Sequence, residues 1–193
     1  MVWLCLVFDA LYDPYQDYRG RVQVMRMFVS RCLTGALLVL VALDAIAMRR
    51  IEPGEDPRLA PDEGLVVLSV DTSARISNVQ IDQVGAGTAV VLNYLDLGQT
   101  LSLYAGKQGE YEWSQVNLTT VDTRSRFEIK KPEFRFRILP GKIAYPGDLV
   151  FRPDSLSSSY IQVHNRALVA MDWLESGHAG LFRSLPFEYS GHY

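Results

Sequence analysis

The chain has 193 residues, of which 48% are hydrophobic and 21% charged, and its formal net charge is -3. This composition is typical of a folded globular protein and excludes a disordered or collagen-like chain. A slightly acidic chain lacks the basic surface that nucleic-acid binding needs, so no nucleic-acid partner is expected. Cys5 and Cys32 have no second cysteine or histidine beside them in the sequence. This spacing excludes a disulfide framework and a CxxC metal site.

Residues 25–47 have the order of a signal peptide. Arg26 and Arg31 provide a basic flank, the apolar run 32–43 follows, and an Ala-Ile-Ala triplet ends at Ala47. A basic flank, a short apolar run and an A-x-A site are the three parts of a secretory signal. The apolar run is shorter than the roughly 20 residues that cross a bilayer as a helix. We therefore predict a signal-like hydrophobic helix that is cleaved after Ala47.

Two alternatives for this segment remain open. If it is not cleaved, it is an inner-membrane anchor, and membrane contact is made only through residues 32–47. A core helix of the same length is the other alternative. Residues 1–24 have no regular period, and Met25 and Met27 stand directly before the basic flank, so we interpret 1–24 as a mis-assigned or disordered extension. The expected localisation is periplasmic or secreted, with an inner-membrane-anchored form as the alternative.

The remainder of the chain is predicted to be a linker followed by a β domain. Residues 48–64 are rich in proline, glycine and acids and have little to bury, which is typical of a linker. Residues 65–193 contain short runs of β-branched and aromatic residues, separated by turn residues every eight to twelve positions. The runs are 64–70, 74–81, 88–95, 100–105, 110–118, 126–130, 133–139, 148–151 and 159–165. This spacing predicts a mainly β fold, an antiparallel β-sandwich.

One short C-terminal helix is expected after the last of these runs. Asn165 can cap its first turn and Gly177 stands where a helix commonly ends. The residues expected on its buried stripe are Ala167, Leu168, Met171 and Leu174. About ten residues are too few for a helix to be stable alone in water, so this helix should pack on the sheets.

The segment LPGKIAYPGDLVF (139–151) contains two Pro-Gly turns and connects three predicted strands. With the strand, the Asn-Arg pair and the short helix that follow, it resembles the C-terminal part of small exported bacterial proteins of unknown function. Their folds are similar to prealbumin-like or carboxypeptidase-regulatory-like sandwiches. The resemblance covers roughly residues 65 to 175. It implies a sandwich fold and an exported location, and it implies no catalytic residues.

Basic residues gather between Arg124 and Lys142 on an otherwise acidic chain. Because side chains alternate along a strand, Arg135 and Arg137 share one strand face. A basic face of this kind can bind an anionic envelope component such as a phospholipid head group. The alternative is a solvated outer face whose charges discourage edge pairing. The candidate anion-binding residues are Arg124, Arg126, Lys130, Arg135 and Arg137.

The sequence contains no nucleophile elbow, Walker loop, H-E-x-x-H or paired CxxC motif. We therefore predict no catalytic residue, no metal ligand and no cofactor. The leading hypothesis is an exported, non-enzymatic interaction or structural module of the cell envelope, with an envelope protein or anionic envelope component as partner. One alternative is a small secreted hydrolase with a Ser/His/Asp group within residues 154–172, built from the Ser155–Ser159 cluster, His164 and an aspartate. A membrane-anchored periplasmic protein that binds anionic ligands through its basic strand face is the other.

Overall fold

The computed structural model describes residues 48–119, 124–129, 131–155 and 158–191. The predicted extension 1–24 and the signal-like segment 25–47 lie outside the described residues. Within the described ranges, no helix has both the length and the apolar character needed to cross a bilayer.

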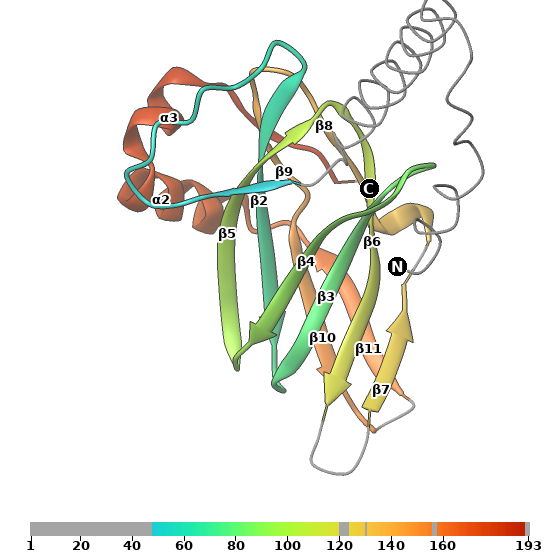
Figure 1. Ribbon diagram of the computed structural model, residues 1–193. Helices are drawn as coiled ribbons and strands as arrows, with labels where there is room; N and C mark the ends of the chain where they lie inside the picture. Colours follow the sequence, from blue (N-terminus) through green and yellow to red (C-terminus); the bar gives the residue numbers. More distant parts are fainter. Residues whose placement is uncertain (1–47, 120–123, 130, 156–157, 192–193) are drawn as a thin grey trace, which may run out of the picture. The chain divides into compact units, whose positions relative to one another are not determined.

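The strands form two sheets, which lie one against the other in Figure 1. Sheet A contains, in hydrogen-bonded order, β1 (Arg49–Ile51), β5 (Gly98–Lys107), β2 (Glu63–Thr72), β10 (Asp148–Pro153) and β11 (Ser159–His164), with β9 (Ile143–Tyr145) paired to β2 and β12 (Phe187–Tyr189) paired to β9. Sheet B contains β4 (Gly87–Leu95), β3 (Ile76–Gln83), β6 (Gly109–Thr119) and β7 (Arg124–Glu128), with β8 (Arg135–Ile138) also paired to β6. The prediction of a mainly β fold is confirmed.

Sheet A is mixed, which corrects the prediction of a wholly antiparallel fold. Three of its strand pairs are parallel, namely β2 with β10, β2 with β9, and β9 with β12. Central parallel strands are buried on both faces and read as continuous apolar runs. The β2 sequence follows that rule, because every residue from Gly64 to Thr72 is buried. A strand with this pattern does not reveal the direction of its neighbours.

A shared apolar core joins the two sheets. Sheet A contributes alternate residues of β2, among them Val66, Leu68 and Val70. Sheet B contributes Trp113 and Phe136, whose ring centroids lie 6.1 Å apart. The other principal residues of this core are Ile76, Val79, Ile81, Leu92, Tyr111, Val116, Ile138, Leu149 and Phe151. The alternation predicted for β8 is correct, since Phe136 and Ile138 are buried and the residue between them is exposed.

Two helices cover part of the other face of sheet A, as Figure 1 shows on the left of the view. They are α2 (Ala167–Gly177) and α3 (Ala179–Ser184). A second apolar cluster joins them to sheet A, and its buried members are Ile51, Leu65, Val67, Leu103, Ala105, Ile143, Tyr145, Ala170, Leu174 and Leu181. Sheet A is therefore the middle of three layers, and we call this surface of it the helix face.

The predicted helix is present as α2, but its buried stripe differs from the prediction. The N-cap position of α2 is Arg166 and not the predicted Asn165, although the Asn165 side chain accepts a hydrogen bond from the Ala167 N–H at 3.1 Å. Ala170 and Leu174 are buried, whereas Leu168 is 76% exposed. The first residues of α2 are apolar without interruption, so the sequence is compatible with burial of either of two faces of this helix. Packing against sheet A selects the face with the smaller Ala170 side chain.

The prediction of a linker at 48–64 is wrong for its first residues. Arg49–Ile51 form β1, which pairs antiparallel with β5, and Ile51 is buried under the helices. Leu59 also packs against the helix-face cluster. Three residues are too short a run to show strand periodicity, so only the presence of an unpaired edge on β5 explains why they form a strand.

Candidate functional site

The five basic residues predicted as an anion site do not form one continuous stripe. Arg124 and Arg126 lie on β7, while Arg135 and Arg137 lie on β8. Both strands pair with β6, but β7 pairs with residues 115–119 and β8 with residues 109–112. Lys130 lies outside the described residues. The two arginine pairs therefore lie beside different ends of β6.

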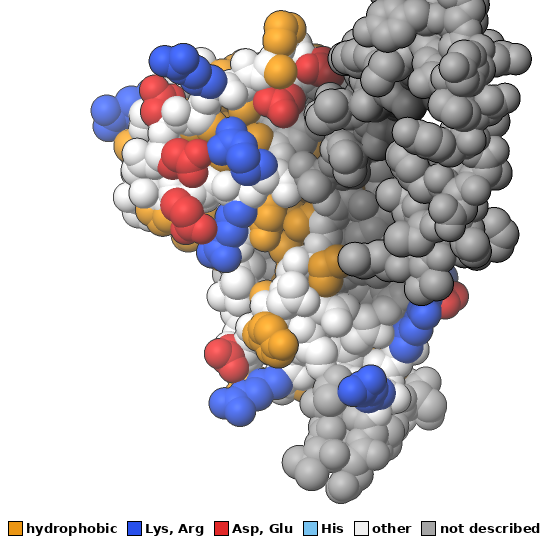
Figure 2. Space-filling model, viewed as in Figure 1, with side chains coloured by type: hydrophobic (Ala, Val, Ile, Leu, Met, Phe, Trp, Pro, Cys, Tyr) orange, Lys and Arg blue, Asp and Glu red, His pale blue; other side chains and the backbone are white. Residues whose placement is uncertain are grey.

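Two of the four described cations form an ion pair with a carboxylate. The Arg126 guanidinium lies 3.2 Å from Glu128, and that of Arg135 lies 3.3 Å from Glu112. Exposed pairs of this type contribute about 0–1 kcal/mol, but they reduce the local positive charge. On the face shown in Figure 2, acidic and basic side chains lie interspersed. The positive charge of the predicted basic strand face is therefore reduced at Arg126 and Arg135.

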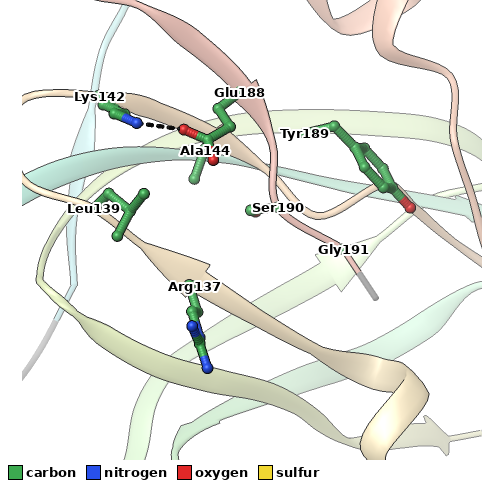
Figure 3. A pocket seen from close by; sticks show the side chains of 8 residues that line it. All are labelled: Arg137, Leu139, Lys142, Ala144, Glu188, Tyr189, Ser190 and Gly191. Carbon is green, nitrogen blue, oxygen red and sulfur yellow. Dashed lines mark hydrogen bonds and ion pairs between the residues drawn. The ribbon is translucent and has the colours of Figure 1, made fainter. Parts of the chain in front are cut away.

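Arg137, like Arg124, differs from Arg126 and Arg135 in having no ion pair among the described residues. It is exposed, and within the described part of the chain no ion pair engages its guanidinium. It lines a cavity of about 250 Å³, shown in Figure 3. The lining residues are Arg137, Leu139, Lys142, Ala144, Glu188, Tyr189, Ser190 and Gly191. Arg137 is thus the one predicted site residue that lies in this cavity.

Three segments of the chain form the walls of this cavity. Gly141, at φ 64°, allows the Pro-Gly turn that brings Lys142 back beside β8. β9 follows, and β12 lies parallel to it at residues 187–189. Gly191 forms an antiparallel bridge with Phe136, and a Cβ at Gly191 would come within 2.5 Å of the Pro146 carbonyl oxygen. The C-terminal segment therefore closes one side of the cavity, because glycine permits the close approach.

The polar groups of this cavity have a net positive charge. The Lys142 ammonium donates to Glu188 at 2.6 Å, whereas no ion pair engages Arg137 among the described residues, although Glu110 of β6 lies directly across from it in strand register. The Ser190 hydroxyl oxygen is buried and has no hydrogen-bond partner among the described residues. In Figure 3 it lies between Arg137 and the Lys142–Glu188 pair. An exposed guanidinium can donate hydrogen bonds to an anionic oxygen.

A second hollow, of about 340 Å³, contains the other predicted pair, Arg124 and Arg126. Asn78 and Asn117 also line it, and their side-chain amides hydrogen-bond each other at 2.6 Å. Arg126 pairs with Glu128, while no ion pair engages Arg124 among the described residues.

Sequence analysis missed a charge network on the helix face of sheet A. Asp148 is fully buried and accepts hydrogen bonds from the Tyr145 hydroxyl and from the Gln99 amide, the latter at 2.8 Å. Arg166 lies 3.5 Å from Asp148 and 3.0 Å from Asp71. Burial raises the pKa of Tyr145 well above its usual range, and the hydrogen bond to Asp148 raises it further. The Tyr145 hydroxyl therefore keeps its proton and is the donor in the hydrogen bond to Asp148.

The second carboxylate of this network, Asp71, is bound by two guanidinium groups. Arg152 lies 2.8 Å from it and Arg166 lies 3.0 Å from it. Burial by itself would raise the pKa of Asp71, but the hydrogen bonds from Arg152 and Arg166 outweigh this effect and lower it. Two cations and two anions balance, so the network ties β2, β10 and the start of α2 together without a free charge. No local sequence signal could have joined residues so far apart in the chain.

The serine cluster and His164 lie at opposite ends of β11. Ser159 pairs with Pro153 at one end of β10, and His164 pairs with Asp148 at the other. Five residue steps of about 3.3 Å place the two strand ends roughly 16 Å apart. The His164 ring instead lies 3.3 Å from the Gln162 side-chain oxygen and 3.5 Å from the Tyr160 hydroxyl. This geometry does not favour a serine-histidine catalytic pair.

Comparisons with known proteins supply no relative. No protein-family model, no curated protein and no solved structure matches the chain. Among the described residues, no group of three or more histidine, cysteine, aspartate or glutamate side chains is arranged to hold a metal ion.

Proposed function

We propose that the protein is an exported, non-enzymatic binding module of the cell envelope that takes the anionic group of an envelope component at the Arg137 cavity. The observation that carries the proposal is the exposed Arg137 guanidinium, which lines this cavity and which no ion pair engages among the described residues. The shared ligand chemistry is a phosphate group, present either on a lipid head group or on a soluble phosphate ester. A guanidinium matches the geometry of phosphate oxygens and makes charge-assisted hydrogen bonds to them.

Export rests on the order of the segments in the sequence. The A-x-A site ends at Ala47, and the next residue, Met48, is buried and donates its backbone N–H to the Ala89 carbonyl at 3.1 Å. Cleavage at this site would make Met48, the first residue that the structure describes, the N-terminus of the mature chain. Mass spectrometry of the native protein tests this part. A mature chain beginning at Met48 is expected, and a chain that retains residues 25–47 in the membrane fraction supports the anchored alternative.

The cavity is tested by a single neutral substitution with a matched control. Arg137→Gln removes the free charge, while Arg135→Gln makes the same chemical change two residues away, at a guanidinium paired with Glu112. Loss of one charge-assisted hydrogen bond, about 1.5–3 kcal/mol, should weaken phosphate binding about tenfold or more. Arg135→Gln should retain the wild-type affinity. Equal losses in both variants would instead assign binding to the whole basic strand face.

Two probes distinguish the sources of the phosphate group. Sedimentation with phosphatidylglycerol vesicles tests a lipid head group, with phosphatidylcholine vesicles as the control. Calorimetric titration with glycerol 1-phosphate tests a free phosphate ester. An Arg137-dependent signal in either assay supports the proposal and names the source. Absence of binding in both assays at low salt, where charge interactions are strongest, would overturn it.

A further inference from the structure

The hollow of about 340 Å³ that contains Arg124 and Arg126 lies on sheet B. Three neighbouring strands, β3, β6 and β7, form it, and they lie side by side in Figure 1. Its polar lining residues are Ser77, Asn78, Asn117, Arg124, Ser125 and Arg126. The Arg137 cavity shares no lining residue with it. We call it the amide hollow, after its two asparagines.

Strand register places a row of polar side chains across the amide hollow. Asn78 of β3 lies opposite Asn117 of β6, and Asn117 lies opposite Arg126 of β7. Residues directly opposite each other share one face of a sheet, and their Cβ atoms lie about 4.5–5.5 Å apart. Val79 and Val116, which are next to the two asparagines in the chain, are buried in the core between the sheets. The row therefore lies on the outer face of sheet B.

The two asparagine amides use only part of their hydrogen-bonding capacity on each other. The Asn117 amide nitrogen donates to the Asn78 amide oxygen at 2.6 Å, and the pair makes no other side-chain hydrogen bond among the described residues. Both N–H groups of the Asn78 amide and the amide oxygen of Asn117 are thus available to a ligand. A hydroxyl group donates and accepts, so neighbouring amide donors and acceptors match the hydroxyls of a sugar ring.

The next row of the same sheet face differs in this respect. Gln80 of β3 lies opposite Gln115 of β6. The Gln80 amide nitrogen donates to the Asp82 carboxylate at 2.7 Å and to the Thr88 hydroxyl at 2.8 Å. The amide donors of Gln80 are therefore used within the protein, whereas those of Asn78 face the hollow without a described partner.

The charge of the amide hollow suits a single carboxylate. Arg124 and Arg126 are two residues apart on β7, so they share a strand face at a spacing of about 6.6 Å. The Arg126 guanidinium lies 3.2 Å from Glu128, and no ion pair engages Arg124 among the described residues. Two cations and one anion leave one positive charge, which one carboxylate neutralises. A phosphate monoester carries about 1.5–2 negative charges at pH 7 and would be neutralised only in part.

We propose that the amide hollow binds a uronic acid, a sugar that carries a carboxylate, with the Arg124 guanidinium on the carboxylate and the Asn78–Asn117 pair on the ring hydroxyls. The planar guanidinium matches the two oxygens of a carboxylate. A neutral sugar would leave the charge of Arg124 unused, and a simple carboxylate would leave the two amides unused. The ligand class and the position both differ from those of the Arg137 cavity.

Three probes test the two halves of this ligand separately. Calorimetric titration at low salt compares trigalacturonate with maltotriose, which lacks the carboxylates, and with acetate, which lacks the hydroxyls. We expect saturable binding of trigalacturonate and binding of each control that is weaker by about tenfold or more. The side-chain amide signals of Asn78 and Asn117 in the NMR spectrum should shift with trigalacturonate. Equal affinity for maltotriose or for acetate would overturn the proposal.

Two substitutions with matched controls locate the site. Arg124→Gln, at an exposed position, and Asn117→Ala should each weaken trigalacturonate binding about tenfold or more. Arg135→Gln, on β8, and Asn93→Ala, in register with Asn78 on β4, make the same changes outside the hollow and should retain the wild-type affinity. Circular dichroism checks that each variant is folded. Wild-type affinity in Arg124→Gln, or equal losses in Asn117→Ala and Asn93→Ala, would contradict this assignment.

Discussion

The helix face of sheet A has two halves that are built from the same strands but in different ways. On β2, Leu65 and Val67 point to the helices and are buried in the apolar cluster. The next two side chains on the same face are Ser69 and Asp71, which belong to a polar half with Asp148 and Gln99. Leu65 and Ser69 are both fully buried, so the change in polarity does not reflect exposure to water.

The difference shows that the helix layer determines whether the buried side chains of a strand in sheet A are apolar or polar. Where α2 and α3 cover the sheet, apolar side chains are stabilised by contact area. Beyond them, burial depends on hydrogen bonds between charges, because an unpaired buried carboxylate is strongly unfavourable. Arg166, directly before α2, contacts both Asp71 and Asp148 and stands at the border between the halves.

The largest effect should come from breaking the polar half at its centre. Asp148→Ala leaves the Tyr145 hydroxyl, the Gln99 amide and part of the Arg166 charge without their acceptor. Removing one partner of a buried charged network is expected to lower the free energy of unfolding by about 3–5 kcal/mol. Urea unfolding followed by circular dichroism measures it. An Asp172→Ala control at an exposed position should change stability by less than about 0.5 kcal/mol. A loss at Asp148 as small as that of the control would contradict the importance of the network.

A somewhat smaller effect is expected in the apolar half. Leu174→Ala removes a fully buried side chain of α2 and should cost about 2–5 kcal/mol. Leu168→Ala makes the same change on the exposed face of the same helix and should cost far less. The same unfolding experiment compares them. Equal losses would mean that the helix packs on sheet A through the stripe that includes Leu168.

The smallest effect concerns pH. The pKa of Asp71 is lowered in the folded state, because the hydrogen bonds from Arg152 and Arg166 outweigh the effect of burial. Its contribution to stability is therefore present above the unfolded-state pKa of about 3.9 and is lost as pH falls through the folded-state value. Asp71→Asn should be less stable than wild type at neutral pH, and the difference should shrink toward pH 2. Thermal unfolding over this pH range measures it, and a constant difference would contradict the assigned sign.

Strands with strong alternation were predictable because their periodicity is local. β8 and β10 appear where the apolar runs place them, and the Pro-Gly steps mark the turns between β8, β9 and β10. β1 and β12 were missed, since each has only three residues and forms because β5 and β9 offer unpaired edges. The direction of the β2–β10 pair was also missed, because a run buried on both faces fits parallel and antiparallel neighbours equally well.

The candidate sites were likewise predictable from the sequence only in part. The sequence located a group of basic residues between 124 and 142, but it could not show that Glu112 engages Arg135. Glu112 lies on the neighbouring strand β6, and only strand register brings it within ion-pair distance of Arg135. The sequence by itself therefore determined the β class, the main strands and the position of α2, since side-chain alternation and turn residues act over a few positions. The third layer, the Asp148 network and the Arg137 cavity were decided only by the tertiary structure, because burial and charge pairing depend on residues that are distant in the chain.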